Sequence, residues 1–265
     1  MDSDGTARHG RAALRWLASG PQLNQLTRLA PVLRLIQEVD GRSLLDAGSG
    51  SRSVAPWLPG WNVTALDSTF DDYGAASGPR RRTARPVLGD IRAMPFRDAE
   101  FDVVLALDVL EHLAPQDRSV ALGELTRVAS RRLVVACPAG APALEADRRL
   151  AGTLPRPPGW LAEHLENGFP EPRELVEALE PHGRVRLIPN EHVRSHERIV
   201  RAELSVLPAA VLRLAALGLS PAMRAAGPAR RLADGVLLRV RGRDRPPAYR
   251  AIVVLDRLDV RMSGS

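Results

Sequence analysis

The sequence predicts an α/β fold in which helices cover a mostly parallel sheet. Seven short segments are rich in Leu, Val, Ile and Ala, as expected for strands that are buried on both faces. Segments with apolar residues at helical spacing separate most of these runs, and this alternation is typical of doubly wound α/β proteins. The length of 265 residues is sufficient for one large domain with a substantial core.

The expected elements follow one another in a regular order. The first helix is expected at 22–39, where leucines recur at helical spacing and Pro31 either shapes the helix or splits it. Strands are expected at 41–47, 61–67, 85–90, 100–108, 131–138, 184–190 and 248–258. Helices are expected at 52–58, 109–113, 115–129, 172–183 and through most of 194–243. The segment 139–171 is rich in Pro and Gly and is expected to form the loop on the acceptor side, although Glu163 and His164 could equally lie on a surface helix.

The composition narrows the range of functions. All 37 basic residues are arginine and the net charge is +6; a GC-rich coding bias explains this pattern, so the charge does not indicate a nucleic-acid partner. Aromatic residues make up only 4%, which argues against the stacking platforms of proteins that bind single strands. The single cysteine, Cys137, lies in an apolar run and is expected to be a buried thiol, with no disulfide and no thiolate metal cluster.

The sequence shows no export or membrane-spanning signal. The N-terminal residues lack the continuous apolar region of a secretory signal. No run of about 18 uninterrupted apolar residues is present, so no spanning helix is predicted. A cytoplasmic location is therefore expected.

A glycine turn follows the first expected strand in the segment SLLDAGSGSRS, residues 43–53. Such turns bind triphosphates, dinucleotides or ligands without a phosphate. A triphosphate loop requires a lysine, which this chain lacks. A dinucleotide fingerprint requires a third small residue, usually Gly or Ala, where Ser53 stands. Asp46 would also face a pyrophosphate unfavourably, so the turn favours a ligand with a cationic or hydrogen-bond-donating end.

The residues downstream of the turn point to one family. Asp67 ends the second expected strand, about 20 residues after Asp46, where carboxylates accept hydrogen bonds from ribose hydroxyls. The segment LGDIRAMPFRDAEFDVVLALDVLEHL, at 88–113, then adds a Gly-Asp pair, a hydrophobic-proline pair and a DVLEH block. In order and spacing, across about residues 40–140, these features resemble the class I S-adenosylmethionine-dependent methyltransferases of the methyltransferase-11-like group.

This resemblance implies the fold and the cofactor. It implies a Rossmann-like, doubly wound, seven-stranded and mostly parallel sheet, with an antiparallel last strand and a helical insertion before it. S-adenosylmethionine would be the cofactor and S-adenosylhomocysteine the product. The cofactor-binding residues implied are Asp46, Gly48, Ser49, Gly50, Asp67, Ser68, Asp90, Ile91, Leu107, Asp108 and His112.

The implied roles differ along the cofactor. The two glycines would let the backbone approach the methionine part, and Asp46 would help hold its amino group through backbone or water. Leu107 and Asp108 would lie beside this part, with His112 near the mouth of the site. At the other end, Asp67 would bind the ribose. The adenine amino group would reach Asp90, with Ile91 packed on the ring.

Simpler structural roles are open for several of these residues. Asp67 and Asp90 are also suited to capping turns at strand ends. Glu111 and His112 are equally compatible with the solvated start of a helix. Asp102 lies at the beginning of the fourth strand, away from the cofactor edge, and is expected to be structural.

Methyl transfer is an in-line displacement that mainly requires alignment and the exclusion of water. A hydroxyl acceptor also benefits from a base, for which His112 and His164 are the catalytic candidates. The segment GWLAEHLENGFPEP, at 159–172, resembles one found in some bacterial methyltransferases of glycan assembly. A small-molecule acceptor or a glycan-like, lipid-linked one is therefore expected, with no metal site and no nucleic acid. An NAD(P)-dependent oxidoreductase and a non-catalytic protein that binds an adenosyl ligand are the alternatives.

One domain is expected to contain the whole chain. Its parts are an N-terminal helical cap at 1–40, a cofactor-binding half at 41–140, an acceptor-side loop, helix and strand at 141–193, a basic helical insertion at 194–245 and the last strand at 246–260. Residues 201–245 contain nine arginines and three acidic residues. The insertion could cover the core or the acceptor site as a lid, lie on an anionic membrane at the inner face, or form a homodimer contact.

Overall fold

The computed structural model describes residues 22–50, 52–70, 84–225, 227–242, 244 and 246–257. Residues 1–21 of the expected N-terminal cap and 258–260 of the expected last strand lie outside these described residues.

A seven-stranded sheet forms the centre of the protein, with the strand order β3-β2-β1-β4-β5-β7-β6. The strands are β1 (Ser43–Ala47), β2 (Asn62–Asp67), β3 (Ala84–Leu88), β4 (Phe101–Leu107), β5 (Ala129–Pro138), β6 (Gly183–His192) and β7 (Ala248–Arg257). Strands β1 to β5 pair in parallel, whereas β7 runs antiparallel between β5 and β6. The predicted doubly wound sheet with an antiparallel last strand is confirmed.

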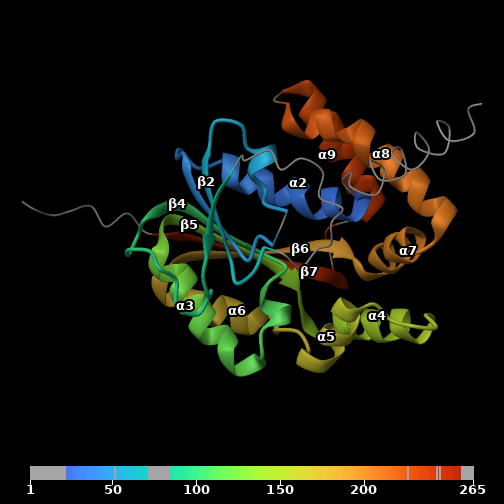
Figure 1. The fold of residues 1–265 in the computed structure, drawn as a ribbon, viewed down its shortest axis with the longest axis horizontal. Coiled ribbons are helices and arrows are strands. Elements are labelled where there is room, and N and C mark those ends of the chain that lie inside the picture. Colours follow the sequence, from blue (N-terminus) through green and yellow to red (C-terminus); the bar gives the residue numbers. More distant parts are fainter. Residues whose placement is uncertain are drawn as a thin grey trace, which may run out of the picture.

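Helices lie on both faces of the sheet (Figure 1). They are α2 (Leu23–Gln37), α3 (Arg118–Val128), α4 (Gly140–Gly152), α5 (Gly159–Asn167), α6 (Pro172–Leu179), α7 (Val193–Glu203), α8 (Val206–Arg224) and α9 (Pro228–Arg241). Alternate strand residues point to opposite faces: Leu44 joins the core beneath α2, α8 and α9, whereas Leu45 joins the core beneath α3 and α6. This two-sided burial explains why the central strands β1, β4, β5 and β7 read as nearly continuous apolar runs.

Several elements differ from the expectation. Helix α2 continues through Pro31 without a break. The segment expected as a helix at 109–113 contains only a short 3-10 helix, Leu110–His112, and the one expected at 52–58 contains only Ala55–Trp57. Helices α4 and α5 occupy much of the segment that was expected to be loop. Alanines and Leu150 on one face of α4 are buried, and this spacing stabilises a helix despite the flanking Pro and Gly.

The helical insertion, α7 to α9, connects β6 to β7 and packs over α2. Met223 and Leu237 are fully buried in the same core cluster as the leucines of α2, so α8 and α9 cover the core. Among the described residues, no single helix is long and apolar enough to cross a bilayer. Helix α7 together with Pro208–Arg224 meets that criterion as a pair, but the pair is bent by 109°.

Candidate active site

The glycine turn connects β1 to the 3-10 helix Ala55–Trp57 at the carboxyl edge of the sheet. Gly48 and Gly50 have φ angles of +72° and +53°, a region that favours glycine. A Cβ atom on Gly48 would lie 2.5 Å from Cγ2 of Val109, which follows β4. The Gly48 and Ser49 amides donate to the Leu66 carbonyl at 2.8 Å and 3.2 Å, tying the turn to β2. The backbone of the turn therefore packs closely against β2 and Val109, which requires glycine at position 48.

Asp46 is buried beneath the turn with 3% of its surface exposed. One of its oxygens accepts a hydrogen bond from the Val54 amide at 2.8 Å. Burial raises the pKa of this carboxyl to about 6, although the bonds from Val54 and Ser53 oppose the shift. Asp46 therefore holds the Val54 amide, just beyond the glycine turn.

We expect Asp46→Asn to stabilise the protein above the pKa of this carboxyl. The folded-state pKa of about 6 exceeds the unfolded value of 3.8, so the folded protein holds the proton longer and wild-type stability falls as pH rises through this window. A shift of about two pKa units corresponds to about 3 kcal/mol. The advantage of the variant, measured by urea unfolding, should grow from about pH 4 to about pH 6 and then level off. An advantage independent of pH would contradict this account.

Asp67 ends β2 and connects the two turns at this edge. Its Oδ2 accepts from the Gly50 amide at 2.7 Å, and its Oδ1 accepts from the Thr69 amide at 3.1 Å. The turn-capping role considered from the sequence is thus present. Each carboxylate oxygen can accept a further hydrogen bond, so this arrangement also allows Asp67 to bind a ligand. The neighbouring Ser68 is exposed.

The predicted adenine contacts have protein partners. The Arg92 side chain donates to both oxygens of Asp90, at 2.7 Å to 3.1 Å, and also reaches Asp117. These hydrogen bonds from Arg92 lower the pKa of the Asp90 carboxyl. Ile91 is 8% exposed and packs in the core. A ring that stacks on Ile91 would therefore contact only its small exposed part.

Asp108 lies in an ion network that the sequence did not reveal. It follows β4 with a φ of +55°, next to the partly buried Leu107. Arg28 of α2 and Arg250 of β7 both pair with its carboxylate. Burial raises the pKa of Asp108, but the two guanidiniums outweigh this effect and lower it. Arg250 also approaches buried Glu191, with 3.5 Å between Nε and Oε2.

The two catalytic candidates meet at this edge. The His112 and His164 rings have centroids 5.2 Å apart. His112 Nδ1 lies 2.9 Å from Glu163 Oε2, and His164 Nδ1 lies 2.7 Å from Asp147 Oδ2. His112 is partly exposed, whereas His164 is 6% exposed and lies in the interior. Both histidines that the sequence analysis selected therefore lie close together. The sequence analysis did not predict Asp147 as the partner of His164.

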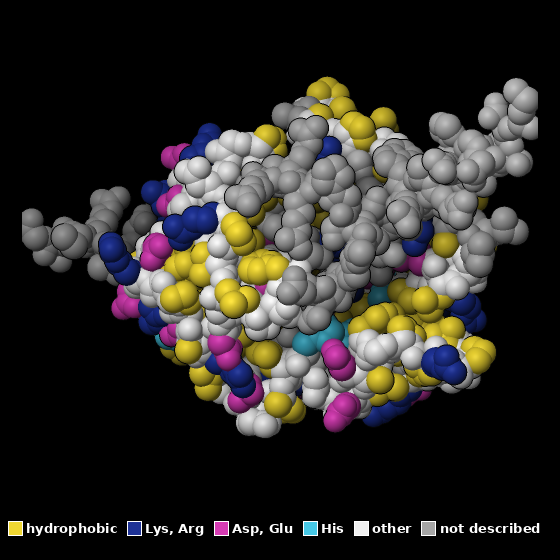
Figure 2. Space-filling model, viewed as in Figure 1, with side chains coloured by type: hydrophobic (Ala, Val, Ile, Leu, Met, Phe, Trp, Pro, Cys, Tyr) yellow, Lys and Arg dark blue, Asp and Glu magenta, His cyan; other side chains and the backbone are white. Residues whose placement is uncertain are grey.

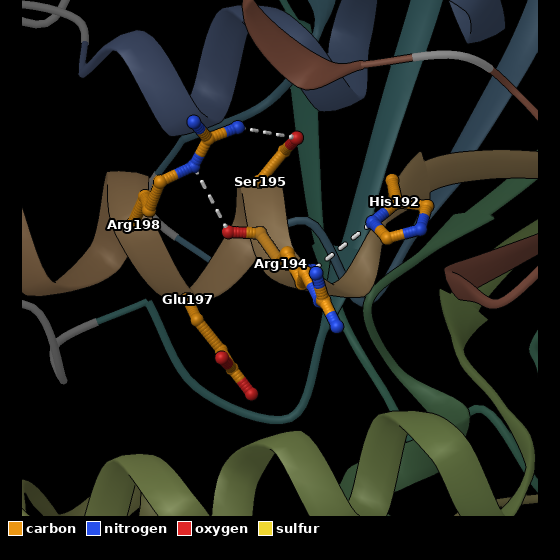
Figure 3. A pocket seen from close by; sticks show the side chains of 5 residues that line it. All are labelled: His192, Arg194, Ser195, Glu197 and Arg198. Carbon is orange, nitrogen blue, oxygen red and sulfur yellow. Dashed lines mark hydrogen bonds between the residues drawn. The ribbon is translucent and has the colours of Figure 1, made fainter.

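A hollow of about 530 Å³ opens where β6 ends and α7 begins. It is lined by His192, Arg194, Ser195, Glu197 and Arg198 (Figure 3). Arg149 of α4 pairs with Glu197, with 2.5 Å between Nη2 and Oε1, whereas Arg194 and Arg198 are exposed. Because β6 is antiparallel to β7, its carboxyl end lies at the same sheet edge as those of β1 and β4. The hollow contains none of the residues predicted from the sequence.

Asp102 lies at the opposite edge, as expected. Its Oδ2 accepts from the Arg42 and Ser43 amides at 2.9 Å and 3.0 Å and from the Ser43 hydroxyl. Its role is to hold β4 against β1.

Cys137 is fully buried in β5, and this burial raises the pKa of its thiol, as expected for a structural cysteine.

Comparison with known proteins identifies the central part of the chain. Residues 45–136, from β1 to β5, match a family model described as a methyltransferase domain. This part of the chain is similar to methyltransferase domains. The match contains the glycine turn, Asp67, Asp90 and His112 and confirms the resemblance stated from the sequence, while His164 lies beyond it.

Solved structures of methyltransferases share the fold of most of this chain. A putative methyltransferase from an antibiotic biosynthesis pathway of Anabaena variabilis is 16% identical, with 89% of this chain and 98% of that chain covered and a TM-score of 0.53. The plantazolicin methyltransferase BpumL, crystallised with a triazolic desmethylPZN analog and S-adenosylhomocysteine, is 14% identical, with 97% and 92% covered and a TM-score of 0.53. At these identities the likeness shows the class I methyltransferase fold alone.

Proposed function

We propose that this chain transfers a methyl group from S-adenosylmethionine to a small-molecule or glycan-like, lipid-linked acceptor. The observation that carries the proposal is the tight glycine turn, hydrogen-bonded to Asp67, within the segment that matches a methyltransferase-domain model. The sulfonium cofactor supplies an activated methyl group. The protein positions the acceptor in line with it and excludes water.

The residues present fit this cofactor at the methionine and ribose positions. At Gly48 there is no room for a side chain, so the backbone itself lines the turn. Asp67 keeps free acceptor capacity for ribose hydroxyls, as argued above. Two of the predicted cofactor-binding carboxylates already have partners in the protein. Asp90 pairs with Arg92, and Asp108 pairs with Arg28 and Arg250. We therefore assign cofactor binding chiefly to the turn and Asp67, with Asp108 as an organised neighbour.

The acceptor would approach from the side of the histidines and the hollow. His112 and His164 stand beyond β4, where a general base would be needed for a hydroxyl acceptor. The exposed arginines of the hollow, Arg194 and Arg198, are suited to an anionic group such as a phosphate. This supports an acceptor that carries a phosphate, including a lipid-linked sugar in a cytoplasmic protein at the inner membrane face. The apolar side chains of Val211, Leu214 and Leu232 are exposed on α8 and α9 and are available for such a surface or for a homodimer.

Ligand binding separates this proposal from its alternatives. Isothermal titration with S-adenosylhomocysteine and with NAD⁺ should give binding only for the first. Binding of NAD⁺ instead would favour the oxidoreductase. Binding of neither ligand would contradict the proposal. S-adenosylhomocysteine binding without methyl transfer to any phosphorylated glycan or lipid acceptor would favour the non-catalytic alternative.

We expect Asp67→Asn to weaken S-adenosylhomocysteine binding by about tenfold, because hydrogen bonds to a carboxylate are stronger than those to an amide. The matched control is Asp102→Asn, which alters a carboxylate with similar backbone partners at the opposite edge of the sheet. This control should leave the affinity unchanged. Equal losses in the two variants would place the effect in the fold rather than in the ligand site.

A further inference from the structure

A cluster of potential metal ligands lies where α5 packs beside the 3-10 helix Leu110–His112. Glu111, His112 and His164 each offer a ligand atom, and these atoms lie within 4.8 Å of one another. Figure 2 shows histidine side chains with acidic side chains beside them, in the region where Figure 1 places α5. We propose that these three residues bind one divalent transition-metal ion of the Zn²⁺ type. The sequence predicts no metal site, because its ligands come from two distant segments.

Both histidines have the carboxylate partners that metal-binding histidines usually have. A carboxylate can only accept, so the Nδ1 atoms of His112 and His164 donate to Glu163 and Asp147. This fixes the tautomer in which each Nε2 atom carries the free lone pair. Carboxylates behind histidines in this way are typical of metal centres, where they orient the ring and raise its basicity. Asp147 is itself held by the Tyr249 hydroxyl at 2.9 Å.

Glu111 provides an independent sign of a missing partner. It is 1% exposed, and its Oε2 atom is buried without a hydrogen-bond partner in the described structure. A buried carboxylate oxygen without a partner is costly and rare in a folded protein. Arg28 and Arg250 act electrostatically on Glu111 but form their ion pairs with Asp108. A metal ion between Glu111 and the two histidines would satisfy this oxygen.

The backbone around the cluster is firmly held. Arg118 donates to the Leu110 carbonyl at 3.0 Å and to the Asn167 and Gly168 carbonyls at 2.9 Å and 2.6 Å. These bonds join the short helix that carries Glu111 and His112 to the end of α5, which carries His164. Trp160 and Phe169 contact the His164 ring edge-to-face. The ligands are therefore held on fixed backbone with an apolar wall, as a binding site requires.

The ligand types select the metal. Two imidazoles and one carboxylate suit Zn²⁺ and similar ions, whereas Mg²⁺ and Ca²⁺ prefer oxygen ligands. Tetrahedral Zn²⁺ places neighbouring ligand atoms about 3.4 Å apart, so the cluster must contract. The partly exposed His112 has room for this movement. Three protein ligands leave a coordination position open.

The coordination position left open would be available to an acceptor. Two of the three ligands, Glu111 and His112, come shortly after Asp108 and Val109 in the chain, and Val109 packs against the glycine turn. An acceptor oxygen bound there would be oriented and made more acidic by the ion. This use of the metal rests on the proposed function, whereas the binding of the metal itself does not. The two Nε2 atoms would then serve as ligands and not as the general base.

Cobalt titration of the full chain tests the site. Co²⁺ added to chelator-treated protein should bind with one equivalent and give visible absorption bands of a nitrogen- and oxygen-ligated ion, and Zn²⁺ but not Mg²⁺ should displace it. His112→Ala changes a partly exposed side chain and Glu163→Gln an exposed one. Each should weaken Co²⁺ binding about tenfold or more. Glu111→Gln should do the same. The control, His182→Ala, removes an exposed histidine from another surface and should have no effect.

S-adenosylhomocysteine affinity, measured on the same samples, separates the two proposals and reports on folding. A wild-type chain that binds S-adenosylhomocysteine but no Co²⁺ overturns the metal site and leaves the proposed function intact. Binding of Co²⁺ that all three site variants retain also overturns the site. A chain that binds Co²⁺ through these residues but no S-adenosylhomocysteine supports the metal site and overturns the proposed function.

Discussion

Arg250→Met should lower the free energy of unfolding by about 3 kcal/mol, because removing one partner of a buried ion pair leaves the other charge uncompensated. The Arg250 side chain is 4% exposed and pairs with Asp108, whose side chain is 14% exposed. It also lies near Glu191, which is buried. Methionine keeps much of the volume and removes the charge. Urea unfolding with a fluorescence readout measures the change.

A surface arginine provides the matched control. Arg173 pairs with Glu177 on α6, where both side chains are exposed. Such pairs contribute little to stability because water and salt screen them. Arg173→Met should therefore leave the unfolding midpoint unchanged. If both substitutions gave the same small change, the network around Asp108 would not be the buried structural element described here.

Gly48→Ala should lower the free energy of unfolding by about 2–4 kcal/mol and weaken S-adenosylhomocysteine binding by about tenfold or more. One part of this cost is the φ angle of +72°, which is unfavourable by about 1–2 kcal/mol for a residue with a Cβ atom. The other part is the contact of the new Cβ with Val109 at 2.5 Å, which forces the turn or the residue after β4 to move. Unfolding and ligand titrations measure the two effects.

Gly60→Ala isolates the contribution of the backbone angle. Gly60 has a φ of +86°, and a Cβ added there has nothing within 4 Å. Its substitution should cost about 1–2 kcal/mol and leave S-adenosylhomocysteine affinity unchanged. A Gly48 variant with the stability and affinity of the Gly60 variant would show that the close approach to Val109 is not a constraint.

Sequence reasoning succeeded where the signal is local. The glycine turn and the acid at the end of β2 can be recognised because strand, turn and acid follow one another within a short stretch, and the φ angles of Gly48 and Gly50 explain the choice of residue. The strands can be recognised because burial on both faces leaves a continuous apolar run. Helix α4 was missed because its flanking Pro and Gly obscured a buried face of small alanines.

The parts of the site that depend on distant segments could not be predicted. Asp108 is paired by arginines from α2 and β7, and neither has a sequence feature that distinguishes it from the other arginines of this chain. The carboxylate behind His164 comes from α4, which was expected to be loop. Because every basic residue of this chain is an arginine, the sequence does not distinguish the few buried arginines from the many exposed ones. Tertiary contacts, not local propensity, determine these pairings.

A crystal structure of the protein with S-adenosylhomocysteine tests the central claim most directly. We predict that the ligand lies at the carboxyl edge of β1 and β2, with its methionine end against Gly48 and Gly50 and its ribose hydroxyls bonded to Asp67. A ligand bound elsewhere, or bound at this edge without contact to the turn and Asp67, would contradict the account.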